Sequence, residues 1–312
     1  MHQFHNILFV SHGIQDEMEG LKQALSLARN NKASLKVLIV YPELPGSHEE
    51  YKKSYEEFLK DRIMTSIQAT QSILKLSESD LHITVEVERG ETPAIRIIRH
   101  VLRNAHDLII KEAESKEGGK GFEALDMTLL RKCPCPVWLC RPINHSRNTI
   151  QVAVAIDPEH EEQVGRDLSM RLLQLSRALA DECSGDLTII SCWIYPFEEY
   201  LHGSTRIKVS KKELHDIVTQ RKTEHLLALE TLIKEANIGG KYQIQHVKGH
   251  PGQVMQHVIE DKKIDILVMG TVARTGISGF IIGNTAESIV QKLSCSLLAL
   301  KPNGFVSPVK AY

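Results

Sequence analysis

Hydrophobic residues form short unbroken runs along the chain, rather than alternating with polar residues. Examples are ILFV at 7–10, VLIV at 37–40 and ILVM at 266–269. A continuous apolar run of this length is typical of a strand in a parallel sheet that helices cover on both faces. Between the runs, apolar positions recur at the spacing of an amphipathic helix. In residues 16–31 they are Met18, Leu21, Leu25 and Ala28. The pattern predicts strands that alternate with helices.

This series of strands and helices occurs twice. Segments of the first half resemble segments of the second half in the same order, and most differences in length fall in loops. The pairs are 5–12 with 149–157, 35–42 with 187–196, 85–101 with 242–258, 105–113 with 263–271, and 135–142 with 295–302. Duplication of a whole domain explains this order, with a boundary within residues 142–148. The expected domains are residues 1–144 and 145–312.

Each half has five predicted strands separated by helical segments. Alternation of this kind predicts a doubly wound, Rossmann-like α/β domain with a five-stranded parallel sheet. A ligand of such a sheet binds beyond the carboxyl ends of the strands. Two similar halves should pack around a pseudo-twofold axis, as the subunits of an isologous dimer do. We therefore expect two tandem domains related in this way.

The composition argues against some classes of function. The 312 residues include 38 basic and 39 acidic side chains, and the net charge of −1 is unlike that of a protein that neutralises nucleic-acid phosphates. The first residues, MHQFHNILFV, lack the basic and apolar regions of a signal peptide. No apolar run approaches the roughly 18 residues that cross a bilayer. We expect a cytoplasmic protein without membrane insertion.

The cysteines fit a reducing compartment. No CxxC pair suggests a zinc ribbon or a thioredoxin motif. We expect the thiols to be buried as small hydrophobic side chains, and a redox or metal-binding role is the alternative. The cysteines are Cys133, Cys135, Cys140, Cys183, Cys192 and Cys295.

A glycine-rich segment joins a predicted strand to a predicted helix near the end of the second half. It reads VMGTVARTGISGFIIGNTAES at 268–288. Its glycines let the backbone approach a ligand closely, and unpaired N–H groups at the start of a helix favour an anion such as a phosphate. Asn284 and Glu287 form a capping-box pattern, which a helix needs with or without a ligand. Phosphate binding and an ordinary turn are both open. Arg274, the one cation in the segment, either contacts a phosphate or is solvated.

Other catalytic and metal-binding patterns are missing from the sequence. The chain has no GxxxxGK[ST], no GxGxxG after the first strand and no GxSxG. His246 and His250 flank a turn that contains a glycine, without a third ligand at the spacing of a metal site. We expect solvated or hydrogen-bonded histidines, no metal site and no catalytic residues. Any nucleotide hydrolysis would then be slow.

The second half resembles the universal stress protein family. Nucleotide-binding members carry G-x2-G-x9-G-[ST] between the fourth strand and the last helix, and an aspartate at the end of the first strand. In this chain Gly270 is followed by Ala273, in place of the second glycine, and then by Gly283-Asn284-Thr285. Asp157 ends the first strand of the second half. The tandem arrangement is similar to that of bacterial E-type members.

The resemblance implies that the second half binds an adenine nucleotide such as ATP, with or without Mg²⁺. Asp157 would accept hydrogen bonds from the adenosine, while Met269 and Gly270 would lie along the ribose and phosphates. The last three motif residues would donate to the phosphates. The residues assigned to this nucleotide site are Asp157, Met269, Gly270, Arg274, Gly283, Asn284 and Thr285.

The sequence departs from the family motif at two positions, and Asp157 has a second interpretation. Ala273 adds a methyl group where the family has none, and Asn284 replaces a hydroxyl residue, although Thr285 next to it can supply a hydroxyl. Asp157 precedes Pro158, so the carboxylate could instead cap a turn.

The first half departs from the motif. Glu112 and Glu123 stand opposite Gly270 and Gly283, and His12 stands opposite Asp157. A carboxylate at about 4 Å from a phosphate costs about 1–4 kcal/mol per pair of unit charges. We therefore expect one nucleotide per chain, bound by the second half. In the first half, a pocket for an apolar ligand and a collapsed core are alternatives. The pocket would be lined by Phe9, Val10 and Ile39.

Three hypotheses of function follow. The first is a cytoplasmic stress-response protein that binds ATP or a relative in its second domain and acts as a regulator or a protective factor. The second is an interaction protein whose first domain binds a partner or an apolar ligand. The third is an enzyme that hydrolyses ATP slowly. In this family the last strands of two domains commonly meet, so residues 135–141 and 295–301 should lie against each other. That contact makes a pseudo-dimer within one chain, and association into a further homodimer stays open.

Overall fold

The computed structural model describes residues 3–114, 119–143, 145–146, 149–159, 162–203, 209–271 and 282–312. The chain divides into two compact units. The first contains residues 1–146 together with 271–312, and the second contains residues 147–270. The last segment of the chain therefore packs with the first half.

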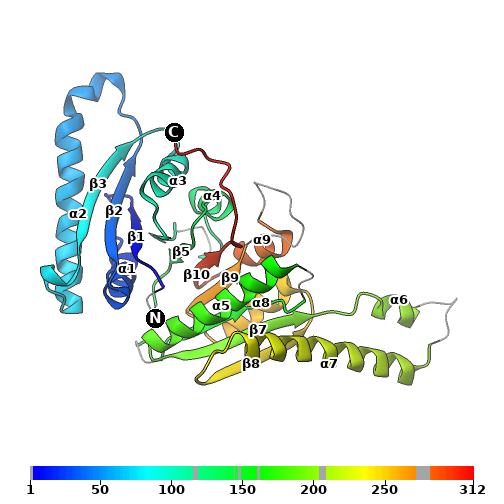
Figure 1. The fold of residues 1–312 in the computed structure, drawn as a ribbon. Helices are drawn as coiled ribbons and strands as arrows, with labels where there is room; N and C mark the ends of the chain where they lie inside the picture. Colours follow the sequence, from blue (N-terminus) through cyan, green and yellow to red (C-terminus); the bar gives the residue numbers. More distant parts are fainter. Residues whose placement is uncertain are drawn as a thin grey trace. The chain divides into compact units, whose positions relative to one another are not determined.

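In the first unit the strand order is β3-β2-β1-β4-β5-β10, and Figure 1 labels all of these strands except β4. Neighbouring strands are parallel except for β10, which pairs antiparallel with β5 and places Leu297 opposite Leu139. This pairing confirms the prediction that the last strands of the two halves lie against each other. The strands are β1 (Asn6–Ser11), β2 (Ser34–Tyr41), β3 (Ile83–Arg89), β4 (Leu108–Glu112), β5 (Val137–Cys140) and β10 (Ser296–Leu300).

The helices of the first unit alternate with its strands, as the hydrophobic pattern predicts. In α1, the stripe Leu21, Leu25 and Ala28 is fully buried. The helices are α1 (Met18–Asn31), α2 (Lys52–Leu74), α3 (Pro93–Asn104), α4 (Ala124–Lys132) and α9 (Asn284–Val290), with short 3₁₀ turns η1 (Gly46–Tyr51) and η2 (Glu78–Asp80).

In the second unit the strand order is β9-β6-β7-β8, and the pairs β6–β9, β6–β7 and β7–β8 are all parallel. The strands are β6 (Gln151–Ala155), β7 (Asp186–Trp193), β8 (Tyr242–Lys248) and β9 (Ile266–Gly270). The helices are α5 (Gln163–Glu182), α6 (Glu198–Gly203), α7 (Lys211–Glu235) and α8 (Pro251–Asp261). Within the part of the chain that the structure describes, no helix has the length and apolar character needed to cross a membrane.

The apolar runs of the first half form a filled core. Phe9 and Ile39 are fully buried, and Val10 is nearly so. A Cβ atom on Gly13, whose φ of +75° lies in the left-handed region, would come within 2.9 Å of Cγ2 of Ile39. The backbone just beyond the end of β1 is thus packed directly against a side chain of β2. Of the two alternatives for these residues, the packing agrees with a collapsed core.

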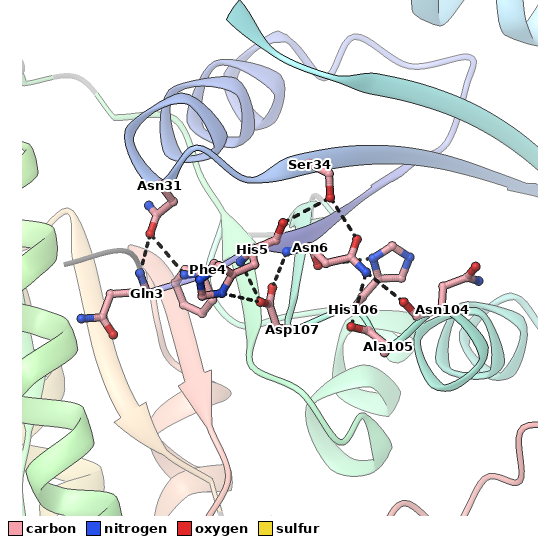
Figure 2. Close-up of polar contacts among 10 residues, drawn as sticks. All are labelled: Gln3, Phe4, His5, Asn6, Asn31, Ser34, Asn104, Ala105, His106 and Asp107. Atoms are coloured by element: carbon pink, nitrogen blue, oxygen red, sulfur yellow. Dashed lines mark hydrogen bonds and ion pairs between the residues drawn. The ribbon is translucent and has the colours of Figure 1, made fainter.

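An aspartate ties the start of the first strand to the fourth strand in each unit. In the first unit, the carboxylate of Asp107 accepts hydrogen bonds from the N–H groups of His5 (2.7 Å) and Asn6 (3.0 Å), as Figure 2 shows. In the second unit, Asp265 accepts one from the N–H of Gln151 at 2.8 Å. The N–H of each aspartate returns a bond, to the carbonyls of Asn6 and Gln151 respectively. These two aligned segments therefore fold alike.

Candidate functional site

The glycine-rich segment begins where β9 ends and finishes where α9 begins. Its interior, residues 272–281, lies outside the described residues, and so do Arg274 and Ala273. The N–H of Gly283 donates to the carbonyl of Thr271 at 3.0 Å. Thr271 directly follows Gly270, so this bond holds the two ends of the segment together. The two described ends of the segment thus meet next to the carboxyl end of β9, a parallel strand.

The start of α9 differs from the prediction by one residue. Gly283, with an extended backbone at φ −58° and ψ 143°, is the residue before the helix, and Asn284 is its first residue. The predicted capping box at Asn284 is therefore wrong. Glu287 does not reach back to a cap, because its carboxylate forms an ion pair with Arg131 at 2.5 Å. The side chains of Asn284 and Thr285 are exposed.

Packing accounts for the glycine at position 270. A Cβ atom there would lie 3.0 Å from Cδ2 of Leu168 on α5, which is tighter than ordinary van der Waals contact. Met269, the preceding residue, is buried in the sheet. The fit of α5 against the strand end therefore favours a glycine at position 270, whether or not a nucleotide is also present.

Asp157 lies at the same edge of the sheet as Gly270. The register pairs Val154 of β6 with Val268 of β9. Continued by two residues, it places Ile156 opposite Gly270, so Asp157 comes just beyond the strand end. Its Oδ1 accepts a hydrogen bond from the N–H of Glu159 at 3.1 Å, across Pro158. This bond is the turn-capping role that the sequence left as an alternative to nucleotide binding.

Asp157 belongs to a cluster of ionisable groups that the sequence analysis missed. One ligand atom each from Asp157, Glu159 and His225 lie within 4.8 Å of one another. Two carboxylates and an imidazole suit a divalent cation such as Mn²⁺ or Zn²⁺, provided that they close to about 2 Å from it. The residues come from the loop after β6 and from α7, so no fixed spacing in the sequence reveals them.

Neighbouring side chains hold this cluster in place. Arg221 binds both carboxylate oxygens of Glu159, at 2.5 and 2.6 Å, and thereby lowers the pKa of Glu159. His225 is buried, which lowers its pKa, and its Nδ1 lies 3.0 Å from Nε2 of His246. Burial likewise lowers the pKa of His246 to about 4, and its ring stacks on Trp193. Both histidines are therefore neutral near pH 7, the state in which imidazole binds a metal.

The sheet register in the first unit confirms the sequence alignment of the two halves at the strand ends. The register of β1 with β4 pairs Val10 with Lys111. Continued by one residue, it sets Glu112 opposite Ser11, just as Gly270 stands opposite Ile156. Glu123 precedes α4 as Gly283 precedes α9. The two glutamates thus occupy the positions that the motif gives to glycine.

Charged side chains of the protein itself occupy this end of the first sheet. Lys111 is fully buried, with Nζ 3.0 Å from the buried carboxylate of Asp126 and 3.3 Å from Glu114. Nε2 of His12 lies 3.6 Å from the same Glu114. Burial raises the pKa of Asp126 and lowers that of His12. His12, at the position of the family aspartate, therefore contacts an internal cluster of charged side chains.

The carboxylate of Glu112 contacts the start of α1. Its Oε2 accepts a hydrogen bond from the N–H of Gly20, on α1, at 2.8 Å. A Cβ atom on Gly20 would lie 3.1 Å from Cβ of Glu112. Burial raises the pKa of Glu112. The carboxylate is thus engaged with the first helix of the unit.

Comparison with known proteins gives the family. The universal stress protein family model matches residues 3–141 and again residues 151–301. The chain belongs to this family. It is 28% identical to universal stress protein E of Photorhabdus laumondii, over 100% of this chain and 99% of the relative. It is also 28% identical to universal stress protein E of Escherichia coli K12, over 99% and 98%. The tandem E-type resemblance is thereby confirmed.

Solved structures share the fold over nearly the whole chain. A functionally unknown protein of Pseudomonas aeruginosa PAO1 matches with a TM-score of 0.71 and 20% identity, covering 97% of this chain and 95% of that one. A universal stress protein of Archaeoglobus fulgidus matches with a TM-score of 0.63 and 17% identity, covering 96% and 99%. Together with the two family matches, they confirm the predicted tandem α/β architecture.

Proposed function

We propose that this stress-response protein binds ATP or a related adenine nucleotide in its second domain, residues 145–312. Family membership supports the role in the stress response. The bound nucleotide would favour one conformation of the tandem protein, which would act in the cytoplasm as a regulator or a protective factor. A ligand shifts such an equilibrium only as far as it prefers one state over the other.

The closed ends of the glycine-rich loop carry this proposal. The Gly283 N–H to Thr271 carbonyl bond returns the chain to the carboxyl end of β9, which is the edge where doubly wound sheets bind ligands. A loop with closed ends and several glycines can present backbone N–H groups to a phosphate. Asp157 follows the neighbouring strand β6, which pairs with β9 in parallel. Asp157 and Gly270 thus follow neighbouring strands at one edge of the second unit.

Each motif residue has a role in the proposed complex. Asp157 would accept hydrogen bonds from the adenosine, and Met269 and Gly270 would follow the ribose. The remaining residues would contact the phosphates: Arg274, Gly283, Asn284 and Thr285. Mg²⁺ would accompany the phosphates. We assign no general base, so the proposal is one of binding and not of turnover.

Calorimetric titration of the full chain with ATP tests the proposal. We expect one nucleotide per chain, and we expect Gly283→Glu to abolish binding by adding bulk and charge beside the phosphates. Thr285→Ala, at an exposed position, should weaken binding without affecting the fold. The matched control is Glu123→Gln, at the same position in the first unit, which should leave binding unchanged. Two nucleotides per chain, or equal affinity in all four proteins, would place the site elsewhere.

The role of Asp157 has its own test. Replacement by alanine should weaken adenosine binding by about 1–3 kcal/mol if a hydrogen bond to the ligand is lost. Titrations with adenosine alone, and with ATP in excess Mg²⁺ or EDTA, separate the base from the phosphates and the cation. If Asp157→Ala lowers only the stability of the protein and not its affinity for adenosine, the carboxylate serves the turn alone.

A further inference from the structure

Two cysteines lie in contact between α4 and β5. The Sγ atoms of Cys133 and Cys135 are 3.5 Å apart. Cys133 is fully buried, whereas Cys135 is partly exposed. Pro134 stands between them and fixes its own φ near −65°, which restricts the backbone of the pair. The sulfur atoms therefore meet at a short, stiff turn, and Cys135 is the less buried of the two residues.

A buried lysine lies beside the pair. Lys301 is 7% exposed, and its Nζ donates to the carbonyl of Leu130 at 2.7 Å and lies 4.9 Å from the ring centre of Phe305. Within the described residues, no carboxylate forms an ion pair with this ammonium group. Burial lowers the pKa of Lys301 to about 8. A buried cation without a counter-ion is costly, and a nearby thiolate would balance it.

The three groups influence one another's protonation. Burial alone would raise the pKa of Cys133, but the S–H of Cys135 and the ammonium of Lys301 outweigh it and lower that pKa. The hydrogen bond to Cys133, followed by burial, raises the pKa of Cys135. The pair therefore gives up its first proton more easily than a single buried thiol would. Because the sulfur atoms are in contact, one proton transfer from Cys135 to the Cys133 thiolate places the negative charge on the partly exposed Cys135.

We propose that Cys133 and Cys135 form a reversible dithiol–disulfide pair that a hydroperoxide oxidises. The Cys135 thiolate attacks one oxygen of hydrogen peroxide, the O–O bond breaks, and Cys135 becomes a sulfenic acid while the leaving hydroxide takes a proton to form water. The sulfur of Cys133 then attacks that of Cys135, the S–O bond breaks, and a second water leaves. Two thiols and one peroxide thus give one disulfide and two waters.

The geometry leaves a short path to the product. A disulfide bond is about 2.05 Å long, so sulfur atoms at 3.5 Å must approach by only about 1.5 Å in total. Cys140 provides a contrast within the same unit. It is fully buried in β5, and burial raises its pKa well above the usual value. A thiol without thiolate character reacts slowly with peroxide, so Cys140 is the matched control.

Treatment of the full chain with hydrogen peroxide, followed by alkylation and peptide mass spectrometry, tests the proposal. We expect the peptide that contains both cysteines to lose two hydrogens and to resist alkylation until dithiothreitol is added. Cys140 should stay alkylatable after unfolding. Cys140→Ala should oxidise like the parent protein, whereas Cys133→Ser should stop at an unresolved sulfenic acid on Cys135, trapped by dimedone.

The lysine has a separate readout. Lys301→Met removes the charge with little change in volume, so it should slow disulfide formation about tenfold near pH 7 and move the pH–rate profile to higher pH. Circular dichroism checks that this variant is folded, and Lys301→Arg should restore part of the rate. Recovery of two free thiols at Cys133 and Cys135 after peroxide treatment of the parent protein would overturn the proposal. Equal oxidation of Cys140 would do the same, because it would mean unselective damage.

Discussion

Gly270 and Glu112 stand at matching strand ends, yet each is fitted to its own helix. In the second unit the small residue is on the strand, because Gly270 faces Leu168 of α5. In the first unit it is on the helix, where Gly20 of α1 faces Glu112. Loss of the motif glycine in the first half is therefore tied to a change of helix packing. Both helix packing and ligand binding can favour a glycine at position 270, and only a substitution experiment separates these two causes.

The contact between Gly270 and Leu168 predicts a steric cost. Gly270→Ala should lower the free energy of unfolding by about 1–3 kcal/mol, because the new methyl group crowds Leu168. Leu168→Ala in the same chain should relieve the crowding, so the double variant should be more stable than the two single effects added together. Urea denaturation measures all three. Gly239→Ala is the control, since open space surrounds that glycine. Additive effects would mean that the two residues do not compete for space.

His106 predicts a dependence of stability on pH. Its ring stacks on His100, its Nδ1 lies 3.3 Å from the carbonyl of Asn6, and burial lowers its pKa from 6.5 to about 4. As the pH falls from 6.5 towards about 4, the His106 ring binds a proton in the unfolded chain but not in the folded chain. The free energy of unfolding therefore decreases. Between pH 7 and 5, the free energy of unfolding of His106→Gln should fall by about 1–2 kcal/mol less than that of the parent protein. Urea midpoints that fall equally with pH in the parent protein and in His106→Gln would contradict this.

At the scale of elements, the paired aspartates before β4 and β9 are a repeated anchor. Asp107→Ala leaves the N–H groups of His5 and Asn6 without their carboxylate, and Asp265→Ala does the same to Gln151. Each should destabilise its unit by about 1–3 kcal/mol. Hydrogen exchange of the amides in β1 and β6 locates the effect. Asp61→Ala, on an exposed face of α2, is the control. Faster exchange in both strands after either substitution would contradict a separate anchor in each unit.

Sequence patterns predicted the elements well where burial decides them. The apolar runs became parallel strands, the stripe of α1 became its buried face, and the repeat aligned strand ends that the sheet register confirms. Capping was predicted less well, because a capping box is a local preference. Gly283 adopts the extended backbone before α9, and Glu287 instead pairs with Arg131, which is 156 residues away.

The candidate site was predicted in part. Asp157 and Gly270 do come to one sheet edge, as parallel strands require. The cluster of Asp157, Glu159 and His225 could not be predicted, because α7 brings His225 back from a distant part of the chain. The direction of Glu112 was also hidden, since it depends on a glycine in α1 that offers both space and an N–H. Nucleotide binding itself stays a prediction.

At the scale of the molecule, β10 completes a sheet that begins at the other end of the chain. A fragment of residues 1–146 contains β5 but lacks β10, so it would expose the edge that pairs with Leu297 and its neighbours. An exposed edge strand of this kind invites pairing with another copy. We expect the fragment to self-associate, whereas the full chain should show no association through β5. Analytical ultracentrifugation over a range of concentrations measures this. A strictly monomeric fragment would contradict the expectation.

The pair of β5 and β10 can form only late during synthesis on the ribosome. β5 ends at Cys140, and β10 begins only at Ser296. At about 5–20 residues per second, roughly 8–30 s pass between their appearances. During that interval the nascent first half has its helices and parallel strands but an open hydrogen-bonding edge. A chaperone that shields this edge, or the emerging second half itself, would protect a polysome from joining neighbouring nascent chains edge to edge.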